Sequence, residues 1–326
     1  MDLLVSVFFF AIGLVLLIKG GDWFVDGATG IAKRFNLPDI VVGATVVSIG
    51  TTLPEVMVST TGALAGSGAM AYGNAIGSII CNTALIAAIS ITCNPGPVNV
   101  NSMKTPAIFF FGAAAIYCLA AYGLGTFPRW LGFIMLAVFV VYMILTVRNG
   151  LKNPDAGEAE EEEGGKPKQL WQELLLLAIG AAVIAVGADL LVEHGQIIAL
   201  SLGVPETVVA LLFVALGTSL PELVTTITSL KKGRASLGVG NVIGANVFNL
   251  VLVSGVAVSL APFDVPVENT LLNTGLNLSL VFDIPVMLGV MSLMIFPAML
   301  GKKLSRWQGI ALLCIYAAFV VCQFVL

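Results

Sequence analysis

The segment GTTLPE at residues 50–55 returns almost unchanged as GTSLPE at residues 217–222, 167 residues later. The same offset places GNAIGSIICN at residues 73–82 over GNVIGANVFN at residues 240–249. In a window of 51 positions around these segments, 17 aligned pairs are identical without a gap. Self-similarity at one fixed offset is the mark of an internal repeat. The chain is therefore a duplicated half.

The composition excludes a soluble fold. Of the 326 residues, 58% are hydrophobic and only 10% are charged, whereas soluble domains carry about 25% charge. The formal net charge is −4 and the sequence has no basic stripe, which argues against nucleic acid as a partner. Five scattered cysteines fit neither a disulfide framework nor a metal-ligand spacing. With one histidine, His194, and no nucleophile and base pair in any span, we expect neither an enzyme nor a bound cofactor.

The apolar stretches predict the fold. A transmembrane helix needs about 20 mostly apolar residues, and polar and Gly/Pro clusters divide the chain into ten such stretches. They lie near residues 3–20, 39–65, 70–92, 105–123, 128–147, 171–191, 205–229, 236–261, 278–299 and 305–325. Because each half contributes five spans, an odd number, the second half enters the membrane from the opposite side. We predict an all-α membrane protein of ten transmembrane helices, built as two inverted five-helix repeats.

The basic residues predict the orientation, because positively charged loops stay in the cytoplasm. With ten spans, fourteen of the fifteen Lys and Arg residues fall on one side and only Arg129 falls on the other. Both termini are therefore predicted outside the cell membrane. The repeats are expected at residues 1–148 and 170–326, joined by an acidic cytoplasmic linker at residues 149–169 that is solvated and disordered.

Two acidic residues lie in the middle of predicted spans. Glu55 and Glu222 occupy corresponding positions of the second and seventh spans, where a charged side chain costs about 2.5–3.5 kcal/mol. A proline precedes each one, and because proline has no N–H, the carbonyl four residues before it is free to bind a cation. Inverted repeats with polar interruptions in corresponding helices are typical of secondary transporters, whose site lies near the midplane between the repeats.

Hydroxyl groups accompany both glutamates. Thr51 and Thr52 lie four and three residues before Glu55 and so share its helix face, and Thr218 and Ser219 repeat this arrangement. Superposing the halves about a two-fold axis in the membrane plane would bring the glutamates together. The resulting oxygen atoms suffice for Ca²⁺, which takes 6–8 oxygen ligands. A set without nitrogen or sulfur fits a hard cation better than zinc or copper.

Amide side chains lie in the third and eighth predicted spans. Asn82 and Asn249 lie in the middle of these spans, and Ser78 lies one turn before Asn82. Asn74 and Asn241 follow a glycine near the start of the same spans. We expect these two to be helix N-caps and not ligands.

At these residues the sequence resembles the sodium/calcium exchanger branch of the cation/calcium antiporter superfamily. The paired G-T-[ST]-L-P-E and G-N-x-I-G-[SA]-x-x-x-N segments look like its two α-repeats. The resemblance implies a central calcium site built from Glu55, Glu222, Thr51 and Thr218. It implies flanking sodium sites built from the Ser48 carbonyl, Thr52 and Glu55, and from the Ala215 carbonyl, Ser219, Glu222 and Ser78. Asn82 and Asn249 would line the middle, and the first and sixth helices would slide across the other eight.

Two positions depart from the family pattern. Asn249 stands where some prokaryotic relatives carry Asp, so the empty site has a charge of −2. Ala245 stands where the counterpart Ser78 supplies a hydroxyl. We therefore expect an antiporter that exchanges Na⁺ for Ca²⁺ across a lipid bilayer. A Ca²⁺/H⁺ or K⁺-assisted exchanger is the alternative, and a passive channel is less expected because one shared carboxylate pair suits alternating access.

Overall fold

The computed structural model of the chain describes residues 3–152, 169–202, 217–266 and 277–325. The α-helices are α1 Leu3–Phe35, α2 Asp39–Val42, α3 Ser48–Leu64, α4 Gly68–Cys81, α5 Ala88–Cys93, α6 Val100–Cys118, α7 Arg129–Lys152, α8 Leu170–Ser201, α10 Leu220–Lys231, α11 Ala235–Phe248, α12 Ser254–Leu260, α13 Ile284–Gly301 and α14 Arg306–Val325. The π-helical segments are Gly43–Val47, Asn82–Ala87, Leu119–Leu124, Asn249–Val253 and Ser279–Asp283. The strands are β1 Gly96–Pro97, β2 Thr126–Phe127, β3 Phe263–Asp264 and β4 Lys303–Leu304.

The π-helical segments join neighbouring helices into longer spans. Within the described ranges, nine helical stretches are long and apolar enough to cross a membrane. The seventh predicted span, residues 205–229, falls partly on residues outside those ranges, and α10 is the portion of it that the structure describes. The predicted all-α membrane fold is confirmed. The linker also lies mostly outside the described residues, although α7 continues into it as far as Lys152.

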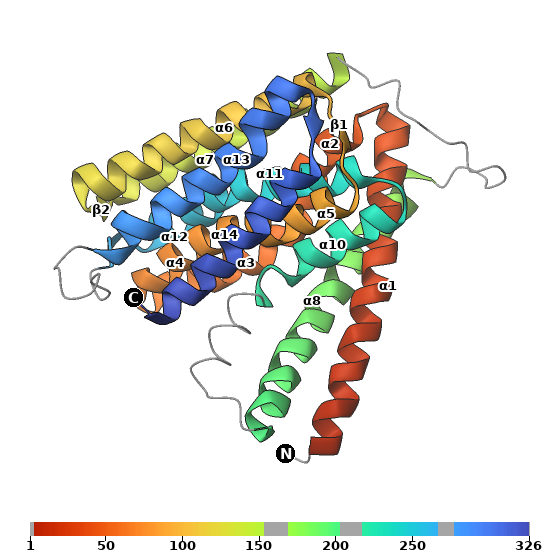
Figure 1. Ribbon diagram of the computed structural model, residues 1–326, viewed down its shortest axis with the longest axis horizontal. Helices are drawn as coiled ribbons and strands as arrows, with labels where there is room; N and C mark the ends of the chain where they lie inside the picture. The colour runs from red at the N-terminus through yellow and green to blue at the C-terminus, as the bar shows by residue number, and fades with distance from the viewer. Residues whose placement is uncertain (1–2, 153–168, 203–216, 267–276, 326) are drawn as a thin grey trace.

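The short strands display the inverted symmetry directly. β1 pairs antiparallel with β4, and β2 pairs antiparallel with β3. β1 and β3 are counterparts at the repeat offset of 167 residues. Each strand pair therefore joins one connection of the first repeat to one connection of the second. Figure 1 places β1 and β2 at opposite ends of α6. Because β3 pairs with β2, the counterparts β1 and β3 lie at opposite ends of the bundle, as expected of two repeats that enter the membrane from opposite sides.

Helices α1 and α8 are much longer than the predicted spans 3–20 and 171–191. They contain 33 and 32 residues and run side by side, extending beyond the rest of the bundle toward the N-terminus (Figure 1). α1 contains the predicted span 3–20 and continues beyond it, where its polar residues have partners. The Lys232 ammonium lies 2.6 Å from Asp26 Oδ1 and 3.6 Å from Asp22 Oδ1.

Glycines let α1 and α8 pack with their backbones in contact. A Cβ added to Gly13 would lie 2.9 Å from the carbonyl oxygen of Gly187, and one added to Gly187 would lie 3.0 Å from the carbonyl oxygen of Gly13. Nearer the other end of the pair, a Cβ on Gly27 would lie 2.6 Å from the carbonyl oxygen of Glu173. Small residues that allow such close approach are typical of helix pairs in membranes.

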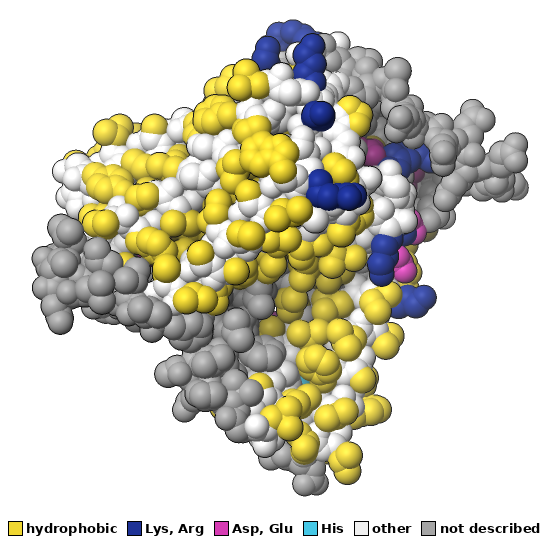
Figure 2. All heavy atoms as spheres, in the orientation of Figure 1, with side chains coloured by type: hydrophobic (Ala, Val, Ile, Leu, Met, Phe, Trp, Pro, Cys, Tyr) yellow, Lys and Arg dark blue, Asp and Glu magenta, His cyan; other side chains and the backbone are white. Residues whose placement is uncertain are grey.

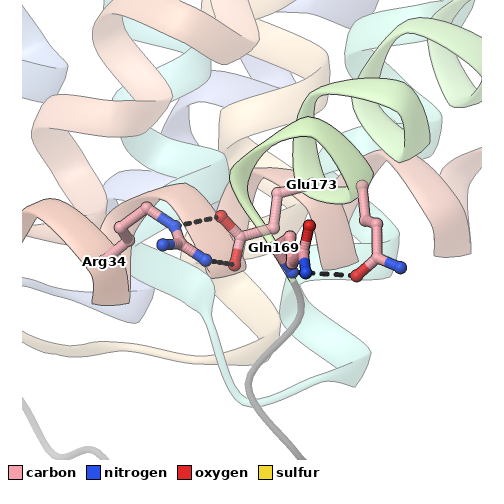
Figure 3. Close-up of polar contacts among 4 residues, drawn as sticks. Arg34, Gln169 and Glu173 are labelled. Carbon is pink, nitrogen blue, oxygen red and sulfur yellow. Dashed lines mark hydrogen bonds and ion pairs between the residues drawn. The ribbon is translucent and has the colours of Figure 1, made fainter.

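An ion pair fastens the last turn of α1 to the first turn of α8. Arg34 Nε donates to Glu173 Oε2 at 2.8 Å and Arg34 Nη2 donates to Oε1 at 3.3 Å (Figure 3). The Glu173 side chain is only 7% exposed. Beside this pair, the Gln169 backbone N–H donates to Gln172 Oε1 at 2.8 Å and caps the start of α8.

The remaining helices form the main body of the protein. The largest buried apolar cluster draws on α4–α7 and α11–α14. Hydrophobic side chains cover much of the outer face seen in Figure 2, whereas the Lys and Arg side chains visible there gather toward the upper right. An apolar outer surface is what a lipid-facing protein requires.

Candidate cation site

The two repeats cross where α11 passes the segment that joins α2 to α3. A Cβ on Gly240 would lie 2.3 Å from the Ile40 carbonyl oxygen, and a Cβ on Gly244 would lie 2.5 Å from Ala44 Cα. This Gly-x-x-x-Gly spacing puts both glycines on one face of α11 and allows close backbone approach. The crossing brings the polar segments of the two repeats together.

The two glutamates enter the crossing from different helical positions. Pro54 and Glu55 lie inside α3. In the second repeat, α10 begins at Leu220, so that Glu222 lies in its first turn, where the helix macrodipole favours a negative charge. The repeats are therefore not identical at the site, because only the second one breaks its helix immediately before the glutamate.

Both glutamates are fully buried. Glu55 and Glu222 are each 0% exposed. Within the part of the chain that the structure describes, none of their four carboxylate oxygens has a hydrogen-bond partner. The two carboxylates interact electrostatically with each other, and the hydroxyls of Thr51 and Thr52 lie beside Glu222. The two carboxylates thus lie within electrostatic range of each other, and their joint role in one cation site stays a prediction.

Four more residues of the predicted site have buried polar groups without hydrogen-bond partners among the described residues. Asn82 and Asn249 each begin a π-helical segment, and both are 0% exposed. Across the described ranges, neither amide group has a hydrogen-bond partner, and the same holds for the hydroxyls of Thr52 and Ser219. Single π-helical turns often occur at functional sites. Buried polar groups normally have partners, so this concentration of unpartnered oxygens marks a place for a ligand.

Two symmetric hydrogen bonds connect the repeats beside the glutamates. Thr51 Oγ1 donates to Asn241 Oδ1 at 3.1 Å, and its counterpart Thr218 Oγ1 donates to Asn74 Oδ1 at 3.4 Å. A hydroxyl that donates its single hydrogen to an amide keeps its lone pairs for another group. Each asparagine therefore leaves the threonine of the other repeat free to present oxygen lone pairs to a cation.

The expectation that Asn74 and Asn241 are N-caps was wrong. Both lie inside their helices, α4 and α11, whose N-cap positions are Ser67 and Arg234. The structure shows them holding the two threonines, a role that sequence reasoning missed. The available signal was that the same amide recurs at the same offset inside two apolar helices, where an unpartnered amide is costly.

The other predicted residues lie at the edge of the cluster or outside the described residues. Ser48 Oγ lies 2.8 Å from the Gly43 carbonyl oxygen and 2.9 Å from the Asn241 carbonyl oxygen, so its hydroxyl is already engaged. Ser78 Oγ lies 3.5 Å from Asn74 Oδ1. Ala215 falls outside the described residues.

Comparisons with known proteins identify the family of this chain. The family model for the sodium/calcium exchanger protein matches residues 5–148 and 173–325. The chain belongs to the sodium/calcium exchanger family. An uncharacterized membrane protein of Methanocaldococcus jannaschii is 34% identical to this exchanger-family chain, covering 96% of both chains. The sodium/calcium exchanger MaX1 of Methanosarcina acetivorans is 29% identical and covers 96% of this chain and 97% of its own length.

A solved structure has the same fold. A structure of the sodium-calcium exchanger NCX_Mj, soaked with Na⁺ and Sr²⁺, superposes on this exchanger-family chain with a TM-score of 0.79 at 32% identity. The match covers 98% of this chain and 99% of that one. The ten-helix architecture of inverted repeats is thus shared along the whole length.

The side chains at the crossing suit a hard cation. The described residues contain no group of three or more His, Cys, Asp or Glu side chains that could hold a metal. The site instead combines two carboxylates with hydroxyl and amide oxygens, the donors that Ca²⁺ and Na⁺ accept and that soft metals do not prefer. Its formal charge of −2 equals the charge of one Ca²⁺ with the opposite sign.

Proposed function

We propose that this protein is an antiporter that exchanges Na⁺ for Ca²⁺ across the cell membrane by alternating access. The observation that supports this most strongly is the pair of fully buried carboxylates, Glu55 and Glu222, without a hydrogen-bond partner in the described part of the chain. Isolated buried charge is expensive. A bound cation would supply the missing countercharge, and its departure would have to be coupled to the arrival of another.

The central calcium site is assigned to Glu55, Glu222, Thr51 and Thr218. The hydrogen bonds of the two threonines to Asn241 and Asn74 support this assignment, because they leave the hydroxyl lone pairs free. Sodium sites on either side would use Thr52 and the Ser48 carbonyl with Glu55, and Ser219, Ser78 and the Ala215 carbonyl with Glu222. Asn82 and Asn249 would line the space between them.

Alternating access is assigned to the α1–α8 pair. The close contacts at Gly13, Gly187 and Gly27, together with the Arg34–Glu173 ion pair, support treating these two helices as one rigid unit. In this conformation both site carboxylates are 0% exposed, as an occluded state would require. Sliding of the pair past the rest of the bundle would expose the site to one side and then to the other.

The distribution of basic residues supports an orientation with both termini outside and the linker at residues 149–169 in the cytoplasm. The two repeats, residues 1–148 and 170–326, would then place corresponding loops on opposite faces of the membrane. Single cysteines introduced as Asp2→Cys and Glu160→Cys, each into a protein without its five native cysteines, test this orientation in intact cells. A thiol reagent that does not cross the membrane should modify the cysteine at position 2 and leave the cysteine at position 160 unmodified.

Resemblance to the exchanger family favours a stoichiometry of three Na⁺ to one Ca²⁺, although two Na⁺ would also neutralise a site of charge −2. One Ca²⁺ neutralises the site and three Na⁺ leave it at +1, so each cycle moves one charge, worth about 2.3 kcal/mol per 100 mV. Ala245 supplies no hydroxyl where its counterpart Ser78 has one, but Ser48, Thr51, Thr52 and backbone carbonyls could still surround a sodium ion beside Glu55. With membrane voltage clamped by valinomycin, calcium uptake driven by outward Na⁺ should fall when the vesicle interior is negative. Uptake that does not depend on voltage would indicate two Na⁺ per Ca²⁺, and Ala245→Ser would then be tested for restored voltage dependence.

Uptake of radioactive calcium into proteoliposomes tests the proposed function. Vesicles loaded with Na⁺ and diluted into Na⁺-free buffer should accumulate calcium, whereas vesicles with only an imposed K⁺ or pH gradient should not. Uptake that follows the K⁺ or pH gradient would support the alternative exchangers and contradict Na⁺ coupling. Single-channel currents in a planar bilayer would contradict antiport altogether.

A further inference from the structure

The helix that carries Glu222 also carries three buried hydroxyls that no site assignment uses. Thr225, Thr226 and Ser229 of α10 are 0%, 2% and 0% exposed. In the described part of the chain, none of their hydroxyl oxygens has a hydrogen-bond partner. Three unpartnered hydroxyls within five residues are unusual, because buried polar groups normally find partners. We call these three residues the hydroxyl row.

The hydroxyl row lies on the same face of α10 as Glu222. At 3.6 residues per turn, Ser229, Thr226 and Thr225 project within about 60° of Glu222 around the helix axis. The opposite face is directed at α1, where Val224 and Thr228 approach Gly21. The row therefore continues the polar surface of the site along α10 toward its end at Lys231.

The first repeat has no such row. The counterparts of Thr225, Thr226 and Ser229 in α3 are Val58, Ser59 and Gly62, so two of the three hydroxyls are missing. The third, Ser59, is occupied, because Asn74 Nδ2 donates to its Oγ at 2.9 Å.

The matching bond in the second repeat is not formed. Asn241 Nδ2, the counterpart of Asn74 Nδ2, has no partner among the described residues, and neither has Thr226 Oγ1. On the face that carries the glutamate, α10 therefore has more hydroxyl groups than α3 has at the corresponding positions. In this conformation these hydroxyls of α10 form no hydrogen bonds within the described part of the chain.

We infer that the hydroxyl row lines the path by which cations travel between the Glu222 side of the site and the membrane face at Lys231, as a series of transient oxygen ligands. A cation that leaves its carboxylates loses several oxygen contacts, and hydroxyl oxygens along the helix replace part of them until water does. The row is unpartnered in the occluded state because its partner is the moving ion or its water. This inference rests on the proposed cation exchange.

The expected consequence is a separation of rate from affinity. Thr225→Val has nearly the same shape, and Ser229→Ala removes one oxygen, so the double variant keeps the packing while it removes two path ligands. We expect its maximal rate of Na⁺-driven calcium uptake to fall about tenfold, a barrier increase of about 1.4 kcal/mol. Equilibrium calcium binding should stay within about twofold of the original protein. Removing unpartnered hydroxyls should leave the thermal midpoint unchanged or raise it.

A control variant outside the hydroxyl row shows whether a loss of rate is specific to the row or follows any Thr→Val substitution. Thr61→Val makes the same substitution at an exposed position of α3, whose hydroxyl is bonded to the Met57 carbonyl at 2.8 Å, and should exchange at the original rate. An unchanged maximal rate in the double variant overturns the inference. A fall in calcium affinity that matches the fall in rate, or a lowered thermal midpoint, also overturns it, because the residues would then belong to the resting site or to the packing.

The proposed function is judged on a separate variant in the same assay. If Glu222→Gln exchanges calcium at the original rate, the site assignment fails, whatever rate the Thr225→Val/Ser229→Ala variant shows. If Glu222→Gln is inactive and the double variant exchanges at the original rate, only the role of the row fails.

Discussion

The crossing of the repeats and the α1–α8 pair solve opposite physical problems in one chain. At the crossing, Glu55, Glu222, Asn82 and Asn249 are buried with unpartnered oxygens, among the residues that the structure describes. In the α1–α8 pair, the one strongly buried carboxylate, Glu173, is fully matched by Arg34. At the crossing, buried polar groups without partners lower the stability of the fold but are available to bind an ion. In the α1–α8 pair, matched charges stabilise the contact between the two helices.

This difference shows where the ion and the motion belong. Unpartnered buried oxygens cost about 1–3 kcal/mol each, so a concentration of them beside two buried carboxylates is expected where a ligand offsets that cost. Matched charges and glycine contacts make a rigid unit, which suits an element that moves as a whole. The predictions below test each side of the comparison.

The largest effect is expected at the helix crossing. In Gly244→Ala the new Cβ would lie 2.4 Å from Ser48 Oγ and 2.5 Å from Ala44 Cα. Overpacking of this kind costs about 1–3 kcal/mol, and a backbone neighbour places the cost at the upper end. Thermal unfolding in detergent should show a markedly lower midpoint. Gly112→Ala, on an open face of α6 with no described atom within 4 Å, is the control and should match the original protein.

A smaller effect is expected from the cross-repeat hydrogen bonds. Asn241→Leu removes the acceptor of Thr51, so the threonine hydrogen turns toward the carboxylates and its lone pairs turn away from the ion. We expect calcium affinity to fall about tenfold, the equivalent of one hydrogen bond. Asn74→Leu should lose less, because the Thr218 contact is longer, 3.4 Å against 3.1 Å. Calorimetric calcium titration compares the two. Equal affinity in Asn241→Leu and the original protein would show that the amide does not orient the threonine.

The smallest effect is expected in the α1–α8 pair. Arg34→Gln leaves Glu173 buried without its cation, but the Arg34 side chain is 34% exposed, so water reaches the gap and the loss should be about 1 kcal/mol. The double variant Arg34→Gln/Glu173→Gln should recover part of this loss, because no unmatched charge remains. A double variant that unfolds earlier than Arg34→Gln would mean that the pair acts through shape and not through charge.

The sequence predicted the parts of the fold that depend on the repeat. One offset of 167 residues and an odd number of spans were enough for the inverted architecture. That inference succeeded because a duplicated half with an odd number of spans must enter the membrane from the opposite side. The recurrence of Glu55 at Glu222 predicted one shared site, because counterparts near the middle of the membrane lie close to the symmetry axis.

The remainder depended on contacts that only folding creates. The full length of α1 was not predictable, because the acidic residues that suggested its end are neutralised by Lys232, about 200 residues away. The roles of Asn74 and Asn241 required knowledge of which helix of the other repeat each one faces. The interruption of the helix before α10 and the π-helical segments at Asn82 and Asn249 depend on local packing. No residue spacing in the sequence predicts them.

The central claim is that Glu55 and Glu222 together hold the transported calcium, and equilibrium binding of radioactive calcium to the purified protein tests it most directly. We predict one calcium bound per chain, displaced by Na⁺. Binding should be lost in both Glu55→Gln and Glu222→Gln, each of which should remain folded with a thermal midpoint at or above that of the original. Glu193→Gln, an exposed carboxylate of α8, should bind normally. Near-normal calcium binding by either site variant would contradict the account.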